Sequence, residues 1–366
     1  MDRLTNIAQQ FAAAKPVTAV QAFGSGNIND TFLVTIADDR EPHFVLQRIN
    51  THVFQQPALV MQNMRILTEH ISAKLLHSPT NVERRWAVPR VLLTRDDCDH
   101  WIEPDGAYWR AISFIDGSET IDLIQDLEHG REVGYALGKF HASISDLDPD
   151  RFADTLPGFH ITPAYLAAYH QVLPTTEVTI DRSVEHCLNF VRERQEWARV
   201  LEDAKSAGKL PLRLIHGDPK VNNVLICTTT QRGIGIIDLD TVKPGLIHYD
   251  IGDCLRSGCN PLGEETQEWE RVQFDTQMCR AILQGYLSQA SGFLTEDDYA
   301  YLFDGIRLIA FELGLRFFTD YLAGNVYFKV KYPTHNLDRA LVQFQLTASI
   351  EAQELEIRSI IEELRA

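Results

Sequence analysis

The first third of the chain alternates short apolar runs with turn-forming clusters. Strand-like runs are expected at residues 17–23, 31–36, 43–49, 89–94 and 108–115, with turns at 24–27 and 38–40 between the first three. An amphipathic helix is expected at 4–14. A second helix is expected to open at Pro57, because Val60, Met64, Leu67 and Ile71 follow at helical spacing. These patterns predict a small α+β region over about residues 15–115.

The rest of the chain is dominated by a different apolar period. Most of residues 120–210 and 265–366 repeat apolar side chains every three or four positions, which predicts helices. One apolar, turn-rich stretch, 212–253, interrupts them. The expected fold class is α+β with two lobes. Residues 1–115 form a small β-rich N-terminal lobe, and residues 116–366 form a larger, mainly helical C-terminal lobe. The connector lies at about 112–118.

Charge and cysteine usage restrict the classes of partner. The chain has 51 acidic and 34 basic residues, a net charge of −17, which argues against nucleic acid or an anionic membrane as partner. A cationic substrate stays open. The six cysteines form no C-x-x-C pair, which is typical of reduced thiols. Because no signal peptide or run of about 18 apolar residues is found, we expect a cytoplasmic protein.

The segment from residue 214 to 240 carries the strongest chemical pattern. Asp218 precedes Pro219 and should therefore lie on a loop. Short apolar strands at 224–227 and 235–237, joined by a turn at 228–233, predict a hairpin. A hairpin returns its two ends to one place, so Asn223 and Asp238 should face the same mouth, next to Asp218.

Two carboxylates and an amide in this arrangement suit phosphoryl transfer. One carboxylate can orient an attacking hydroxyl, while an amide oxygen and the second carboxylate can hold magnesium against the phosphates. The spacing D-x4-N, then an apolar hairpin, then Asp, matches the kinase catalytic pattern. An ordinary Asp-Pro turn before a surface hairpin is the alternative. It does not account for acids at both ends and an amide at the start of the strand.

The segments His216-Gly217-Asp218 and Asn223, followed by Ile-Ile-Asp238, resemble the aminoglycoside phosphotransferase and choline kinase group, which has the protein-kinase-like fold. Blocks at residues 24–32, 46–50, 238–241, 249–253 and 316–321 resemble its N-acetylhexosamine 1-kinase branch. By position, the resemblance implies Asp218 as the catalytic base and Asn223 with Asp238 as ligands of Mg2+. The sugar pocket that it implies is lined by Thr241, Arg316 and Tyr327.

The nucleotide side is expected in the N-terminal lobe, with ATP as the bound nucleotide. Small residues in the turn after the first strand let backbone N–H groups approach phosphate oxygens; this turn comprises Gly24, Ser25, Gly26 and Asn27. Kinases of this fold place a lysine on a following strand, but here that strand reads FVLQRIN. Gln47 takes the aligned position, and we expect Arg48 to supply the charge. Ser113 and Ile115, in the connector, are expected to contact the adenine.

The leading hypothesis is an ATP- and magnesium-dependent kinase. Its expected acceptor is a sugar hydroxyl, the anomeric one of an N-acetylhexosamine. One alternative is a kinase for an amino alcohol or an aminoglycoside, and another is a catalytically inactive nucleotide-binding regulator, which the missing lysine keeps open. Asp240 is open between a second metal contact and a structural cap. Expected partners are ATP and the small-molecule sugar, with neither nucleic acid nor membrane; the sequence predicts no oligomeric state.

Overall fold

The structure is a computed structural model, which describes residues 2–13, 15–24, 28–77 and 84–365. The chain divides into two compact units. The smaller unit contains Met1–Ser118, Asp150–Pro157 and Ile237–Lys243, and the larger unit contains Glu119–Pro149, Gly158–Ile236 and Pro244–Ala366. Two short segments from far along the chain thus belong to the smaller unit. The division at residue 115 stays a prediction.

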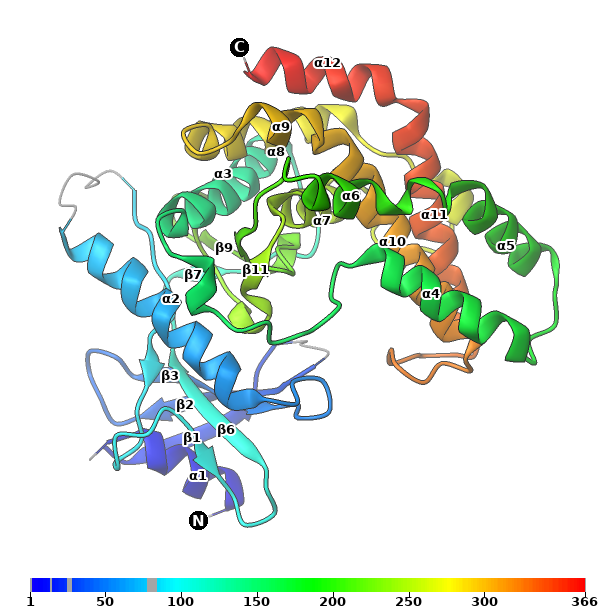
Figure 1. The fold of residues 1–366 in the computed structure, drawn as a ribbon. Helices are drawn as coiled ribbons and strands as arrows, with labels where there is room; N and C mark the ends of the chain where they lie inside the picture. The colour runs from blue at the N-terminus through cyan, green and yellow to red at the C-terminus, as the bar shows by residue number, and fades with distance from the viewer. Residues whose placement is uncertain (1, 14, 25–27, 78–83, 366) are drawn as a thin grey trace. The chain divides into compact units, whose positions relative to one another are not determined.

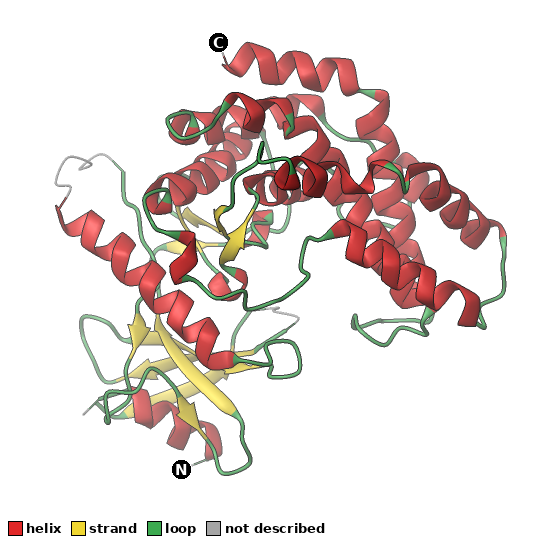
Figure 2. Ribbon diagram, viewed as in Figure 1, coloured by secondary structure: helices red, strands yellow, loops and turns green. Residues whose placement is uncertain are grey.

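The smaller unit is built on an antiparallel sheet (Figures 1 and 2). Its strand order is β1-β2-β3-β6-β4, and β5 pairs with β6. In this sheet Gln47 lies opposite Arg110. The strands are β1 (Val17–Ala22), β2 (Asp30–Ile36), β3 (His43–Ile49), β4 (Val91–Leu92), β5 (Trp101–Ile102) and β6 (Tyr108–Ser113).

A helix packs on each face of this sheet. Side chains alternate between the faces of a strand, so Phe44 and Leu46 share one face with the core of α1 (Arg3–Phe11). Ile49 and Tyr108 on the other face pack against α2 (Pro57–His77). Gln47 and Arg110 lie on the α2 face, whereas Arg48 is on the α1 face.

The larger unit is mostly helical, with several short strands (Figure 2). Its sequence-predicted hairpin is formed by β9 (Val224–Cys227) and β10 (Gly233–Ile236). The other strands in this part of the chain are β7 (Ser118–Glu119), β8 (Arg213–Ile215) and β11 (Lys243–Gly245). The helices are α3 (Leu127–Ile144), α4 (Thr162–Val172), α5 (Arg182–Arg194), α6 (Val200–Ser206), α7 (Ile247–Gly258), α8 (Thr276–Ala290), α9 (Glu296–Ala300), α10 (Leu302–Leu322), α11 (His335–Ala352) and α12 (Glu354–Arg365).

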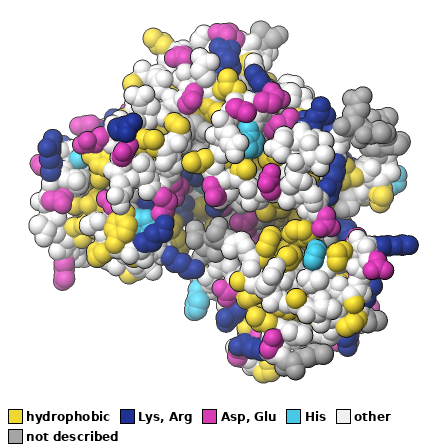
Figure 3. Space-filling view, turned by 180° about the vertical axis from the view of Figure 1, so that it is seen from behind, with side chains coloured by type: hydrophobic (Ala, Val, Ile, Leu, Met, Phe, Trp, Pro, Cys, Tyr) yellow, Lys and Arg dark blue, Asp and Glu magenta, His cyan; other side chains and the backbone are white. Residues whose placement is uncertain are grey.

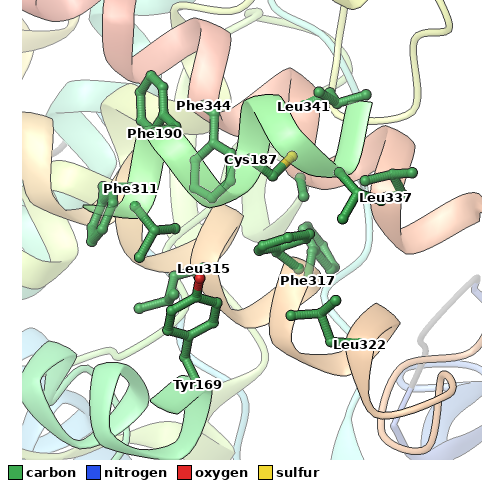
Figure 4. Close-up of a cluster of buried hydrophobic side chains, with 14 of the residues drawn as sticks. Tyr169, Cys187, Phe190, Phe311, Leu315, Phe317, Leu322, Leu337, Leu341 and Phe344 are labelled. Atoms are coloured by element: carbon green, nitrogen blue, oxygen red, sulfur yellow. The ribbon is translucent and has the colours of Figure 1, made fainter. Parts of the chain in front are cut away.

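An aromatic core joins α4, α5, α10 and α11 of the larger unit (Figure 4). The rings of Phe190 and Phe344 stack with their centroids 4.7 Å apart. Helices α3 and α8 cross with their backbones in close contact. A Cβ atom on Gly134 of α3 would lie only 1.9 Å from the carbonyl oxygen of Ile282 of α8. Glycine is therefore required at that crossing. The predicted fold class, a β-rich N-terminal region followed by a mainly helical C-terminal region, is confirmed.

Surface charge and helix hydropathy are two properties relevant to the kinds of partner that the protein can have. On the face drawn in Figure 3, acidic and basic side chains are interspersed. Within the part of the chain that the structure describes, no helix combines the length and the apolar character needed to cross a membrane.

Candidate active site

The loop before the β9–β10 hairpin is held by a buried carboxylate of α7. Asp250 accepts hydrogen bonds from the backbone N–H of His216 at 2.6 Å and of Gly217 at 2.8 Å. His141 of α3 contacts the same carboxylate at 2.8 Å. Burial disfavours the charged form of Asp250, but these hydrogen bonds outweigh it and hold its pKa below the ordinary value. The backbone that leads to Asp218 is thereby anchored to two helices.

Asp218 lies beside a lysine and an asparagine of the same loop. The Nζ atom of Lys220 is 2.9 Å from Oδ2 of Asp218. The Nδ2 group of Asn223 donates to the backbone carbonyl of Asp218 at 2.7 Å. The sequence analysis did not assign Lys220, although its place two residues after Asp218 on a loop was a usable signal.

The orientation of Asn223 suits a hard cation. Since its Nδ2 group is used on the Asp218 carbonyl, its Oδ1 atom is the end left for a ligand, and it has no hydrogen-bond donor among the described residues. Asp238 lies two residues after the end of β10 and has a left-handed backbone, with φ of 66°. That conformation costs a non-glycine residue roughly 1–2 kcal/mol. Amide and carboxylate oxygens are suitable donors for magnesium, so both residues fit their predicted role chemically.

The segment that carries Asp238 is anchored within the smaller unit through Asp240. One carboxylate oxygen of Asp240 forms an ion pair with Nη1 of Arg110 at 2.5 Å, and the other accepts from Nδ2 of Asn29 at 2.7 Å. The hydroxyl of Thr155 donates to the Asp240 carbonyl at 3.1 Å. Because both carboxylate oxygens contact protein side chains, the structure favours the structural role that the sequence had left open.

Strand β3, which lacks the lysine, lies beside the cationic side chain of Arg110 on strand β6. Oε1 of Gln47 accepts from Nε and Nη2 of Arg110 at 2.9 and 2.7 Å. Gln47 also donates to the hydroxyl of Thr31 at 3.1 Å. Arg48 points to the opposite face, where its side chain is 48% exposed and lies 3.8 Å from Asp30. Its expected contact with phosphate stays a prediction, and a buried arginine in the apolar run of β6 was the signal that the sequence analysis missed.

The other predicted nucleotide residues are partly engaged by the protein. Gly24 is exposed with φ of 74°, and Ser25, Gly26 and Asn27 lie outside the described residues. The hydroxyl of Ser113 accepts from the Arg90 backbone at 2.9 Å. The carbonyl of Ile115 accepts from the Ser118 hydroxyl at 2.6 Å. Their contact with adenine stays a prediction.

Arg316 of α10 lies within a cage of aromatic rings. Its guanidinium carbon is 5.2 Å from the ring centre of Phe159, 5.0 Å from that of Tyr165 and 5.5 Å from that of Phe328. Among the described residues, no carboxylate forms an ion pair with it. Burial disfavours its charge, but Tyr165 and nearby acids, Asp218 among them, raise its pKa. Arg316 is therefore close enough to Asp218 for the two charges to interact.

Asp320, one turn after Arg316, has a separate task. The Asp320 carboxylate accepts from the backbone N–H groups of Val326, Tyr327 and Phe328 at 2.8 to 2.9 Å. Asp320 thereby holds the loop that contributes Phe328 to the cage and exposes Tyr327. Of the predicted sugar-pocket residues, Arg316 and Tyr327 belong to the larger unit and Thr241 to the smaller.

Comparisons with known proteins decide the family. Residues 19–281 match the model of the phosphotransferase enzyme family. The chain belongs to this family. It is a phosphotransferase.

Solved structures share its fold at low sequence identity. An aminoglycoside phosphotransferase from Alicyclobacillus acidocaldarius is 17% identical with a TM-score of 0.63, covering 98% of this chain and 96% of its own. A choline kinase from Cryptosporidium parvum is 17% identical with a TM-score of 0.56, covering 93% and 91%. An amicoumacin kinase solved with AMP-PNP and Ca2+ is 14% identical with a TM-score of 0.58, covering 99% and 94%.

Proposed function

We propose that this phosphotransferase moves the γ-phosphoryl group of ATP to a hydroxyl of an uncharged sugar, the anomeric hydroxyl of an N-acetylhexosamine. Asp218 orients the acceptor hydroxyl and takes its proton. The ammonium of Lys220, 2.9 Å away, keeps the carboxylate in one orientation. The resemblance of five sequence blocks to the N-acetylhexosamine 1-kinase branch supports the choice of sugar.

The charges around Asp218 support an acceptor without a positive charge. Three acids of the larger unit have a cationic or imidazole partner: Asp218 pairs with Lys220, Asp253 with Arg256 at 2.8 Å, and Glu312 with His160 at 2.9 Å. Arg316 is the cation without a carboxylate partner among the described residues. A cationic acceptor would have to approach Arg316 with no uncompensated acid to attract it.

The aromatic cage carries this proposal. Aromatic cages bind quaternary ammonium ligands through the negative faces of the rings. Here Phe159, Tyr165 and Phe328 surround the guanidinium of Arg316, so the protein's own cation takes the place of a ligand cation. The N–H groups of the guanidinium can then donate to sugar hydroxyl or acetamido oxygens. Solved neighbours named for choline or aminoglycosides share the fold, and this cage is the feature that argues for a different acceptor class.

Magnesium is the metal that we propose, held by Asn223 and Asp238. When bound, such an ion offsets the charge of the nucleotide phosphates. The chain's own contribution is to fix the amide of Asn223 through the Asp218 carbonyl, so that its oxygen is presented in one direction.

A panel of acceptors tests the proposal. The purified protein is incubated with magnesium-ATP and N-acetylhexosamines, plain hexoses, amino alcohols or aminoglycosides, and phosphorylated product is detected by mass. We expect product from an acetamido sugar and none from the cationic acceptors. Product from choline or an aminoglycoside alone would overturn the choice of acceptor. ATP binding with no product from any acceptor would support the inactive regulator. The Asp218→Asn protein, prepared identically, controls for contaminating kinases.

A further inference from the structure

The larger unit buries five of the chain's described histidines, and their ring contacts differ in kind. In three of them, one ring nitrogen faces a group that can donate a hydrogen bond. Nδ1 of His216 accepts from the Asp218 backbone N–H, and Nδ1 of His335 accepts from that of Lys331, each at 3.2 Å. His141 faces the Tyr286 hydroxyl, which can donate, at 3.0 Å. Of the two ring nitrogens of His248, only Nε2 has a hydrogen-bond partner among the described residues, the carbonyl of Asp298 at 2.9 Å.

His160, in contrast, faces a pure acceptor at each ring nitrogen. Nδ1 is 2.9 Å from a carboxylate oxygen of Glu312, and Nε2 is 2.7 Å from the carbonyl oxygen of Gly217. A neutral imidazole has one N–H group and would turn a lone pair toward the other oxygen. The second oxygen of Glu312 accepts from the Thr162 hydroxyl at 2.6 Å. The geometry therefore requires two protons on the ring.

The contact with Gly217 bears directly on Asp218. The Gly217 carbonyl belongs to the peptide bond whose nitrogen is that of Asp218. His160 holds the oxygen of this peptide group at 2.7 Å, while His216 accepts from its N–H at 3.2 Å. The plane of the peptide group is thus fixed from both ends. Because the Asp218 Cα atom is attached to this plane, the direction of its side chain depends on both contacts.

The position is built to hold the ring. His160 is 4% exposed and has a left-handed backbone with φ of 64°, which costs a non-glycine residue roughly 1–2 kcal/mol. The Tyr249 ring of α7 stacks on it at 5.4 Å. The charged and titratable groups that contact it or act on its charge are Glu312 of α10, Tyr249 and Asp253 of α7, and Tyr165 of α4.

We propose that His160 is a positioning residue for Asp218: as an imidazolium paired with Glu312, it holds the Gly217 carbonyl and so orients the catalytic loop. This rests on the proposed function, in which Asp218 receives the acceptor hydroxyl. Loss of the ring proton breaks one of the two contacts and loosens the peptide group. Phosphoryl transfer should then depend on the protonation state of His160, although the ring proton of His160 is not transferred to the substrate.

The direction of the pH effect follows from the surroundings. Burial disfavours the charged ring, but the charge and hydrogen bond of Glu312 outweigh it and raise the pKa of His160 above its ordinary 6.5. A raised pKa means that the contact is complete below pH 6.5 and is lost as pH rises through the folded-state pKa. The turnover number should therefore fall on the alkaline side.

Nuclear magnetic resonance of the wild-type protein with isotope-labelled histidine tests the protonation without any acceptor. The His160 signal is identified by its loss in His160→Gln. We expect protons on both ring nitrogens of His160 at pH 7 and a single one on His248, whose pKa burial lowers. One proton on His160 at pH 7 would overturn the proposal even if the protein phosphorylates a sugar. Failure of the proposed function would instead show in the acceptor panel.

The pH profile of turnover tests the positioning role. Glu312→Gln removes the counter-charge, so the alkaline limb should move down by about one pH unit or more. His160→Gln should lower kcat about 10- to 100-fold with little change in the KM of ATP, because it acts on Asp218. His248→Gln is the matched control and should leave the limb in place. An unshifted limb in Glu312→Gln, with His160 signals and melting temperature preserved, would overturn the role.

Discussion

Arg110 of β6 and Asp240 form an ion pair that is almost fully buried, with side chains 1% and 2% exposed and the two charged atoms 2.5 Å apart. Gln47 binds the same guanidinium, and Asn29 binds the same carboxylate. The pair thus ties two strands and the start of β2 to the segment that carries Asp238. Because both partners are buried, water cannot solvate the charge that remains when its partner is removed.

The first prediction follows from that burial. Asp240→Asn and Arg110→Gln should each lower the free energy of unfolding by about 3–5 kcal/mol, since each leaves one buried charge unpaired. The double variant should lose less than the sum of the two. Urea unfolding measures all three. Arg48→Ala, which removes an exposed pair, should change stability by less than about 1 kcal/mol; a loss as large as that of Arg110→Gln would contradict the assignment.

The second prediction separates two assignments for the strand without a lysine. Gln47 faces Arg110, while Arg48 is on the other face of the sheet beside Asp30. Gln47→Ala should therefore raise the KM of ATP, because it releases Arg110 and disturbs Asn29 through Asp240. Arg48→Ala should leave that KM within about twofold. The reverse result, with ATP affinity lost only in Arg48→Ala, would restore the cation expected from the sequence.

The third prediction concerns Asp218. Asp218→Asn keeps the shape and removes the base, so kcat should fall about 10²- to 10⁴-fold. The KM of ATP should change little, because the carboxylate acts on the acceptor hydroxyl. Steady-state kinetics with the sugar found in the panel measure both constants. Near wild-type turnover in Asp218→Asn would remove this residue from the mechanism.

The fourth prediction concerns the metal. Asn223→Ala should lower activity, and excess magnesium should restore it. Asp238→Ala should stay inactive at any magnesium concentration, because a carboxylate contributes more than an amide to binding a hard cation. Titration of activity with magnesium at saturating ATP measures the difference. Equal rescue of the two variants would argue against a metal that draws on both residues.

The fifth prediction concerns the acceptor. Arg316→Gln should raise the KM of the sugar about tenfold or more and leave the KM of ATP unchanged, because a directional donor pair is lost. Arg316→Lys should restore little, since an ammonium cannot reproduce the planar fork. Arg307→Gln, on the same helix, is the matched control, because Arg307 pairs with Asp304 at 2.8 Å and contacts neither cage nor loop. An unchanged sugar KM in Arg316→Gln would exclude it from the acceptor site.

Most of the secondary structure and a hypothesis for the chemistry of one loop followed from the sequence. Apolar spacing located strands β1, β2, β3, β4 and β6 of the small sheet, but not β5, and also helix α2 and the β9–β10 hairpin, because periodicity reflects which side of an element is buried. Asp218 precedes a proline and lies five residues before Asn223, and this local spacing indicated phosphoryl transfer. These features depend on neighbours in the chain, and local spacing is what a sequence records directly.

The tertiary structure alone decided which distant side chains meet. Gln47 and Arg110 are 63 residues apart, and strand register across β3 and β6 places them opposite each other. His160 and Glu312 are 152 residues apart, on a loop and on α10. Nothing in the spacing of either pair predicts contact, because the pairing depends on how separate elements pack. The buried Arg110 beside Gln47 and the histidine behind Asp218 could therefore be found only in the folded chain.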